Sequence, residues 1–168
     1  MIAGLSYNLV NFNYKQYLSV QASAVVPLYN NNNGTSSLGL GDYGSEVKLM
    51  YCGSLPGGKA YFNTEVAYRR YFDVQGPNQF SYLFTLGYAV SKYNQISADL
   101  YFLRSFSEDK AFNSNIFAER DYAYFKPQLN FGHRFTRRFS TFIGGYYIPY
   151  GINTGVGYGG SIIAVIKL

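Results

Sequence analysis

The chain has 168 residues, of which 20% are aromatic and 14% are charged, and its formal net charge is +5. An ordinary globular domain carries about 25% charged residues, so the composition argues against an exterior that faces water on all sides. No apolar run approaches the roughly 20 residues that a membrane-spanning helix needs. If the chain crosses a membrane, it must do so as a closed sheet that satisfies its own backbone hydrogen bonds.

Composition also disfavours other classes. Lys and Arg are scattered through expected turns and strand ends rather than gathered in a stripe, which argues against nucleic-acid binding. Cys52 is the single cysteine, which excludes an intrachain disulfide and a cysteine-rich metal site. Residues 1–7 lack the basic and then apolar pattern of a signal peptide, so we expect either a removed signal or an incomplete chain.

Residues 80–90 give the clearest local pattern. Bulky side chains occupy every second position, which is the period of an extended strand. A soluble strand with one buried face normally carries charge on its other face, yet the second face here is small or weakly polar. This pattern is typical of a strand whose bulky face meets lipid while its small face lines a barrel.

The same alternation predicts nine strands over a single domain, 1–168, and most reach the roughly 9 to 11 residues that cross a bilayer. The expected ranges are 2–10, 16–27, 44–53, 59–72, 80–91, 95–105, 121–133, 139–150 and 156–168. Short and long connections alternate between them. In bacterial barrels short turns face the periplasm and long loops face outward, and the strand number is even.

Nine strands conflict with that even number, and two interpretations remove the conflict. In one, residues 1–15 are a partial or extra strand and eight strands from Gln16 onward close the barrel. In the other, which we favour, the chain is the later part of a larger barrel of 10 to 12 strands. Both interpretations predict an all-β, transmembrane, up-and-down antiparallel β-barrel with 8 to 9 strands in this chain.

Three segments carry a resemblance that covers nearly the whole chain: GLGDYG at 39–44, VKLMYCGSLPGGKAYFNTEVAYRRYF at 47–72 and NQFSYLFTLGYAVSKYNQISADLYFL at 78–103. They resemble the later strands of poorly characterised, porin-like outer-membrane β-barrel proteins of Gram-negative bacteria. The resemblance implies additional N-terminal strands, a location in the outer membrane, and a lipid bilayer with lipopolysaccharide as surroundings. One departure is the terminus, because such barrels usually finish on Phe and this chain finishes on Leu168.

The bulky face of each strand is expected to face lipid. Its members include Leu18, Val20, Ala22, Ala24, Val26, Phe62, Thr64, Val66, Ile96, Ala98, Leu100, Phe102, Ala123, Phe125, Leu129, Phe131, Ile162, Ala164 and Ile166. Aromatic residues gather at strand ends, as two interfacial belts require. Tyr14, Tyr17, Tyr51, Tyr88, Tyr93, Phe131 and Phe139 are expected toward the short turns, and Tyr43, Tyr68, Tyr82, Tyr122, Tyr147 and Tyr158 toward the long loops.

The opposite face is polar and is expected to face the lumen. The candidate lumen residues are Glu46, Lys48, Asn63, Glu65, Arg69, Asp99, Tyr101, Lys126 and Gln128. A hairpin symmetric about Pro56-Gly57 would set Lys48 opposite Glu65, with Glu46 and Arg69 one step away, and these opposite charges should pair. Such a network either fills a narrow barrel as scaffold or lines a solute path.

Other motifs do not support chemistry. Residues 155–160 satisfy the dinucleotide pattern G-x-G-x-x-G but run into a β-branched strand instead of a helix. His133, the single histidine, falls beside the short turn 134–138 without triad partners, so aromatic packing is expected. Pro127 and Pro149 each remove a ladder donor and predict local bulges. We therefore expect no catalytic residue, cofactor or metal.

These patterns predict an outer-membrane β-barrel that acts as a porin-like channel or passive transporter of small solutes, and not as an enzyme. The alternative is a structural or interaction barrel with a plugged lumen, whose long loops at 28–43 and 105–120 make the functional contacts. A soluble lipocalin-like barrel shares the strand order but would need a charged exterior. Protein partners and substrate are not indicated by the sequence.

Overall fold

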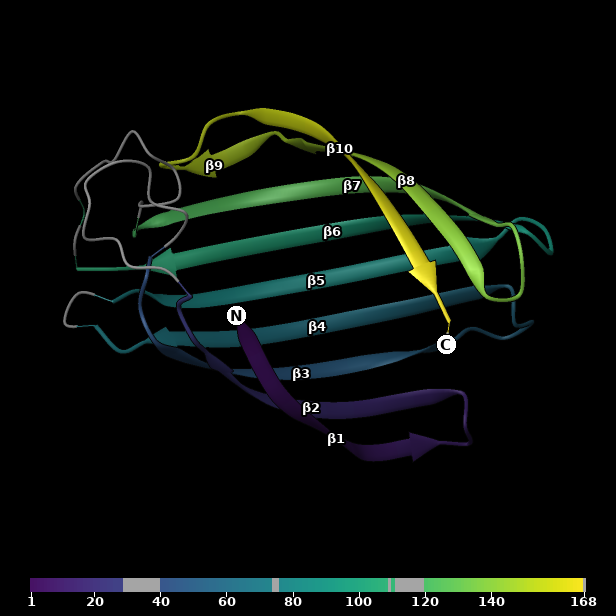
Figure 1. Ribbon diagram of the computed structural model, residues 1–168, viewed down its shortest axis with the longest axis horizontal. Helices are drawn as coiled ribbons and strands as arrows, with labels where there is room; N and C mark the ends of the chain where they lie inside the picture. Colours follow the sequence, from purple (N-terminus) through teal and green to yellow (C-terminus); the bar gives the residue numbers. More distant parts are fainter. Residues whose placement is uncertain (29–39, 74–75, 109, 111–119, 168) are drawn as a thin grey trace.

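The computed structural model describes residues 1–28, 40–73, 76–108, 110 and 120–167, and these fold as one antiparallel up-and-down sheet (Figure 1). Its strands are β1 (Ile2–Phe12), β2 (Gln16–Val25), β3 (Gly44–Ser54), β4 (Ala60–Tyr71), β5 (Asn78–Ala89), β6 (Asn94–Phe106), β7 (Tyr122–Arg134), β8 (Phe139–Ile148), β9 (Tyr150–Ile152) and β10 (Gly157–Ile166). The described part of the chain contains no helix that is long and apolar enough to cross a membrane.

The nine predicted strands correspond to β1–β8 and β10, and the fold class all-β with up-and-down antiparallel order is confirmed. The predicted count of 8 to 9 strands is wrong, because the sheet has ten strands. The additional strand is β9, which pairs with β7 beyond the end of β8.

The two prolines explain why β8 and β9 are separate. Gln128 of β7 pairs with Tyr146 of β8, whereas Phe125 of β7 pairs with Tyr150 of β9. Three steps along β7 therefore correspond to four steps along the facing segment, which contains Pro149. Pro127 lies in the same interval of β7. Neither ring carries a donor for the ladder, so the extra residue forms the bulge that the sequence predicts there.

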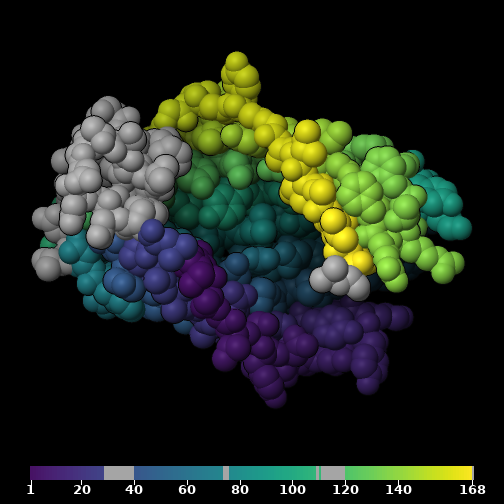
Figure 2. All heavy atoms as spheres, in the orientation of Figure 1, coloured from purple at the N-terminus to yellow at the C-terminus, as the bar shows by residue number. Residues whose placement is uncertain are grey.

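The sheet is strongly curved but does not close (Figure 1). Strands β1 and β10 are the two ends of the path and do not pair with each other. Figure 2 shows a hollow that opens between these edges, with the inner strands visible at its floor. The prediction that eight strands from Gln16 close a barrel is therefore wrong, because β2 pairs with β1 along the length of that strand.

Hydrogen bonds that skip a strand identify the concave face. Gln79 of β5 donates to the Tyr122 hydroxyl of β7 at 3.2 Å, and Gln95 of β6 donates to the Tyr61 hydroxyl of β4 at 3.3 Å. Side chains two strands apart approach each other most readily on the inside of a curved sheet. The concave face is accordingly the more buried one, with Ala67, Gln79 and Ser105 exposed by 4%, 5% and 0%.

Two glycines on the concave face make room for aromatic rings from neighbouring strands. A Cβ on Gly87 would lie 2.1 Å from Cζ of Tyr61, and one on Gly159 would lie 2.5 Å from the Tyr146 hydroxyl oxygen. Large side chains thus lie over the bare backbone of the next strand, an arrangement that accompanies curvature in sheets. The Tyr61 and Tyr146 rings therefore lie along the inner wall, over positions that carry no side chain.

The convex face is apolar and exposed. Leu5, Leu129 and Ile162 are exposed by 85%, 71% and 77%. Their neighbours on this face include Val47, Leu49, Phe80, Tyr82, Leu86, Tyr88, Ile96, Leu100, Phe131, Ile143 and Tyr147, all large and all exposed. A continuous apolar surface of this extent is far larger than the isolated patches of ordinary soluble domains.

Candidate functional site

The concave face brings the predicted lumen residues together on one surface. The strand registers place Glu46, Lys48, Asn63, Glu65, Arg69, Asp99, Tyr101, Lys126 and Gln128 at positions of the same face across β3, β4, β6 and β7. Thr85 on β5 and Ser161 on β10 extend this polar surface. It is therefore a candidate site for contact with a solute.

Two ion pairs join β3 and β4 on this face. Arg69 donates from Nε and Nη2 to Oε2 of Glu46 at 2.9 and 2.5 Å, and from Nη1 to the Tyr71 hydroxyl at 3.2 Å. Lys48 Nζ lies 3.0 Å from Oε2 of Glu65. The prediction that these opposite charges pair is confirmed.

The register behind these pairs differs from the predicted one. Glu46 lies directly opposite Arg69, and Lys48 lies opposite Ala67, so Lys48 reaches Glu65 along a diagonal. The hairpin is symmetric about Gly57 and Gly58, both with positive φ of 91° and 70°, and not about Pro56-Gly57. Two successive left-handed residues favour glycine at both positions, which moves the tip of the turn by one residue.

Asp99 is held by neutral donors. The Thr85 hydroxyl donates to Oδ1 at 2.7 Å, and Asn130 Nδ2 donates to Oδ2 at 2.7 Å. Gln128 Nε2 donates to Oδ1 of Asn130 at 2.7 Å and to the Ser161 hydroxyl, two strands away, at 3.3 Å. Within the described ranges Asp99 makes no ion pair with a Lys or Arg, so it contributes an uncompensated negative charge to the inner wall.

Lys126 supplies the corresponding uncompensated positive charge. Its Nζ lies 5.6 Å from the ring centroid of Tyr101 and 5.2 Å from that of Tyr146, as cation–π contacts. No carboxylate of the described residues lies within ion-pair distance of it. The concave face therefore combines two internal ion pairs with one separated anion and one separated cation.

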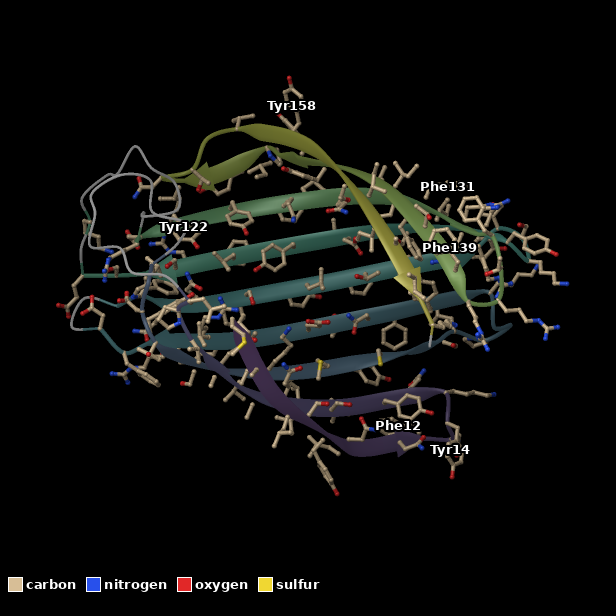
Figure 3. The ribbon with its side chains drawn as sticks, viewed as in Figure 1. Phe12, Tyr14, Tyr122, Phe131, Phe139 and Tyr158 are labelled. Carbon is tan, nitrogen blue, oxygen red and sulfur yellow. The ribbon has the colours of Figure 1, made fainter. Side chains whose placement is uncertain are left out.

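Three tyrosines of β6 and β7 cluster on the concave face toward the loop side. Tyr122 and Tyr124 stack at 6.3 Å between centroids, and Tyr101 lies 5.8 Å from Tyr124. Figure 3 labels Tyr122 at this end. The prediction that Tyr122 belongs to an outward aromatic belt is therefore wrong. The same holds for Tyr17, which lies on the concave face of β2, as Ser19 does. Alternation alone could have shown this, because Tyr122 and Lys126 are an even number of residues apart on one strand.

Outward aromatic contacts do cluster near the short turns. The Tyr51 ring lies 6.4 Å from Phe12 and 5.1 Å from Phe62, and its hydroxyl donates to Gln16 Oε1 at 2.5 Å. Phe12, Tyr14, Phe131 and Phe139 are labelled at this end in Figure 3, and Tyr158 projects from β10.

His133 belongs to the same end of the sheet. Its ring packs edge-on against Phe135 at 4.6 Å, and its Nδ1 lies 2.6 Å from Oδ1 of Asn94. The predicted aromatic packing of His133 is confirmed. The described residues include no group of three or more His, Cys, Asp or Glu side chains that could hold a metal ion.

Charged residues at the opposite end pair with one another. Arg120 forms ion pairs with Asp73 at 2.8 Å and with Asp42 at 3.6 Å. Asp121 forms ion pairs with Arg104 and Lys110, each at 3.0 Å. Burial raises the pKa of the Asp42 carboxyl, against the opposing effect of the Arg120 charge. Most of the loops 28–43 and 105–120, predicted as an interaction surface, lie outside the described residues.

Comparisons with known proteins give no relative. No protein-family model matches the chain, and no curated protein or solved structure matches it at a significant level.

Proposed function

We propose that this chain forms the greater part of an outer-membrane β-barrel that acts as a porin-like channel or passive transporter for small solutes. The observation that carries the proposal is the sorting of side chains between the two faces of the sheet. The convex face is apolar and exposed, whereas the concave face holds ion pairs, amides and tyrosines. Barrels in the outer membrane have this arrangement, with lipid outside and polar groups inside.

The unpaired edges of β1 and β10 determine how many further strands are needed to close a barrel. All neighbouring strands along the path from β1 to β10 are antiparallel, so these two edge strands run in the same direction. One strand, or any odd number of strands, must therefore be inserted between them to close an antiparallel barrel. The path from β1 to β10 has nine strands, because β9 lies off it as a continuation of β8 along β7. Addition of one or three strands of a longer polypeptide therefore gives the even-stranded barrels of 10 or 12 strands.

A wider barrel also favours an open lumen. Small eight-stranded barrels have interiors that side chains fill, whereas the lumen grows with strand number. The charges of the inner wall lie close to that wall, because each ion pair joins adjacent strands. Such pairs leave the centre of a wider barrel available to water and solutes.

The second candidate function is a structural or interaction barrel with a plugged lumen. The observation that favours it is the set of contacts two strands apart, such as Gln128 to Ser161, which draw side chains inward. In that case the functional contacts belong to the long loops at the end opposite the short turns.

Planar-bilayer recording of the longer polypeptide that supplies the missing strands, refolded into lipid, tests the proposal. A channel gives discrete conductance steps, and samples run without heating show the altered gel mobility of a folded barrel. Protein that inserts and shows this mobility but never conducts supports the plugged barrel. Protein that stays monodisperse in buffer without detergent contradicts both candidates.

A further inference from the structure

Positive charge is concentrated at the end of the sheet that carries the short turns. Its seven basic residues are Lys15, Lys59, Lys92, Arg134, Arg137, Arg138 and Lys167, and all are exposed. We call this set the basic rim. Every short turn falls within the described ranges, and none of them contains Asp or Glu. Nitrogen atoms project at this end in Figure 3, on the right of the view.

The opposite end differs both in the balance of its described charges and in their pairing. Its described charges are Asp42, Asp73, Glu108 and Asp121 together with Arg70, Arg104, Lys110 and Arg120, and all but two of these eight make ion pairs with one another. By contrast, no member of the basic rim forms an ion pair with any described residue. The rim therefore presents unneutralised positive charge to whatever lies beside it.

An apolar groove of about 680 Å³ runs along the convex face from β5 to β8. Its floor is low because the small residues Ala98 and Gly145 lie on either side of Leu129. Leu86 and Ile143 form its walls. The surface of the groove is almost wholly hydrocarbon, which suits an alkyl chain and not a polar ligand.

The groove leads to the basic rim. Tyr88 and Phe131 line its end near the turns, and the β7–β8 turn that carries Arg137 and Arg138 follows β7 beyond Phe131. Lys92 and Arg134 instead line a separate pocket on the concave side, together with Gln95, Gly132 and Phe142. The backbone N–H of Arg134 donates to the Tyr93 carbonyl at 2.8 Å, and the Arg134 guanidinium donates to the carbonyl of Lys92. The β5–β6 and β7–β8 turns are thus held together directly beyond the groove.

We propose that the groove and the adjoining part of the basic rim bind an anionic phospholipid. One acyl chain lies between β5 and β8, and the phosphate lies beside Arg137 and Arg138 in the β7–β8 turn. Guanidinium groups bind phosphate oxygens through paired donors, and basic clusters at a membrane surface select anionic over zwitterionic lipids. This inference rests on the membrane location in the proposed function.

Two double variants with the same change of net charge test the headgroup contact. Arg137→Gln with Arg138→Gln removes two charges from the rim, whereas Arg70→Gln with Lys110→Gln removes two from the opposite end. Native mass spectrometry of protein from mixed micelles measures retained phosphatidylglycerol and phosphatidylcholine. We expect retention of phosphatidylglycerol to fall about tenfold in the rim variant only, because each basic residue contributes to anionic-lipid attraction.

A third variant tests the groove. Ala98→Phe fills its floor on the convex face and is expected to reduce retained phosphatidylglycerol severalfold while folding, followed by gel mobility without heating, is unchanged. Equal losses in the rim and control variants, equal retention of the two lipids by the parent protein, or an unchanged Ala98→Phe variant would each overturn the lipid site. Those results leave the channel proposal standing if the parent protein still inserts and conducts. A parent protein that fails to insert overturns both.

Discussion

Arg69 on β4 reaches one carboxylate oxygen of Glu46 on β3 through two hydrogen bonds, of 2.9 Å from Nε and 2.5 Å from Nη2. Glu46 is only 7% exposed, whereas the Arg69 side chain is 25% exposed. The buried Glu46 carboxylate therefore depends mainly on the Arg69 guanidinium to neutralise its negative charge. The second pair, Lys48 with Glu65, is more open, at 26% and 22%.

The first prediction concerns the unequal burial of these two pairs. Glu46→Gln leaves Arg69 with a neutral partner in a crowded part of the wall, and we expect a loss of about 1 to 3 kcal/mol in the free energy of unfolding. Lys48→Gln affects the more exposed pair and is expected to cost less than about 1 kcal/mol. Urea unfolding from lipid vesicles measures both. A larger loss in Lys48→Gln would contradict the ranking.

The second prediction tests which face meets lipid. Leu100 lies on the convex face of β6, and we expect Leu100→Arg to lower the free energy of folding into a bilayer by about 2 to 4 kcal/mol near the midplane. Ser97 lies on the concave face of the same strand, so Ser97→Asn should have a much smaller effect. Refolding into vesicles of one lipid composition gives both values. Equal penalties would show that the faces are assigned wrongly.

The third prediction concerns the close approach of Tyr61 to Gly87. A side chain at position 87 must displace the Tyr61 ring, and with it the hydrogen bond that Gln95 donates to the Tyr61 hydroxyl. We expect Gly87→Val to cost about 1 to 3 kcal/mol, as overpacked sites do. Gly145→Ala is the control, because a Cβ there meets only the Gly159 carbonyl oxygen, at 3.9 Å. Similar stability of the two variants in thermal unfolding would argue against the close contact.

The strands could be predicted from the sequence because alternation at period two is a local property. The register of the β3–β4 hairpin could not, because it depends on which residues adopt positive φ, and both Gly57 and Gly58 are able to do so. The break between β8 and β9 was indicated by Pro149, but a short strand beyond it has too few residues for a periodic pattern.

The candidate site could be predicted as a set of residues but not as a set of contacts. Lys126 was placed on the polar face by alternation, yet its position between the rings of Tyr101 and Tyr146 joins three strands. Contacts between non-adjacent strands depend on the curvature of the sheet, which single-strand patterns do not report. The open edges of β1 and β10 are a further long-range property that strand counting only suggested.

The fourth prediction is a pH dependence at the loop end. Burial raises the pKa of Asp42 above its ordinary value of 3.8, with the Asp73 carboxylate adding to the rise and Arg120 opposing it. A raised folded-state pKa means that the stabilisation is complete below the unfolded-state pKa and is lost as the pH rises through the folded-state value. Asp42→Asn cannot ionise, so it should be more stable than the parent protein at pH 7. Thermal unfolding should show this difference disappear below about pH 3.8, and a difference that grows on acidification would reverse the assignment.

The last prediction separates an open channel from a plugged barrel. Glu65→Gln with Asp99→Asn removes two negative charges from the concave face, and in a conducting barrel the lumen then favours anions more strongly. The reversal potential across a salt gradient should shift toward the equilibrium potential of the anion. Asp73→Asn with Glu108→Gln removes the same charge at the loop end and should shift it less.

In a plugged barrel the same double change has a different consequence. Lys48 loses its carboxylate partner in a confined interior, whereas Arg69 keeps Glu46, so the expected loss of stability is that of one pair and not of two. Recordings and thermal unfolding of the same preparations distinguish the two cases. A parent protein that inserts without conducting, together with a clearly destabilised double variant, would exclude the channel and leave the plugged barrel. Conductance whose ion preference does not change would exclude Glu65 and Asp99 from the conducting path.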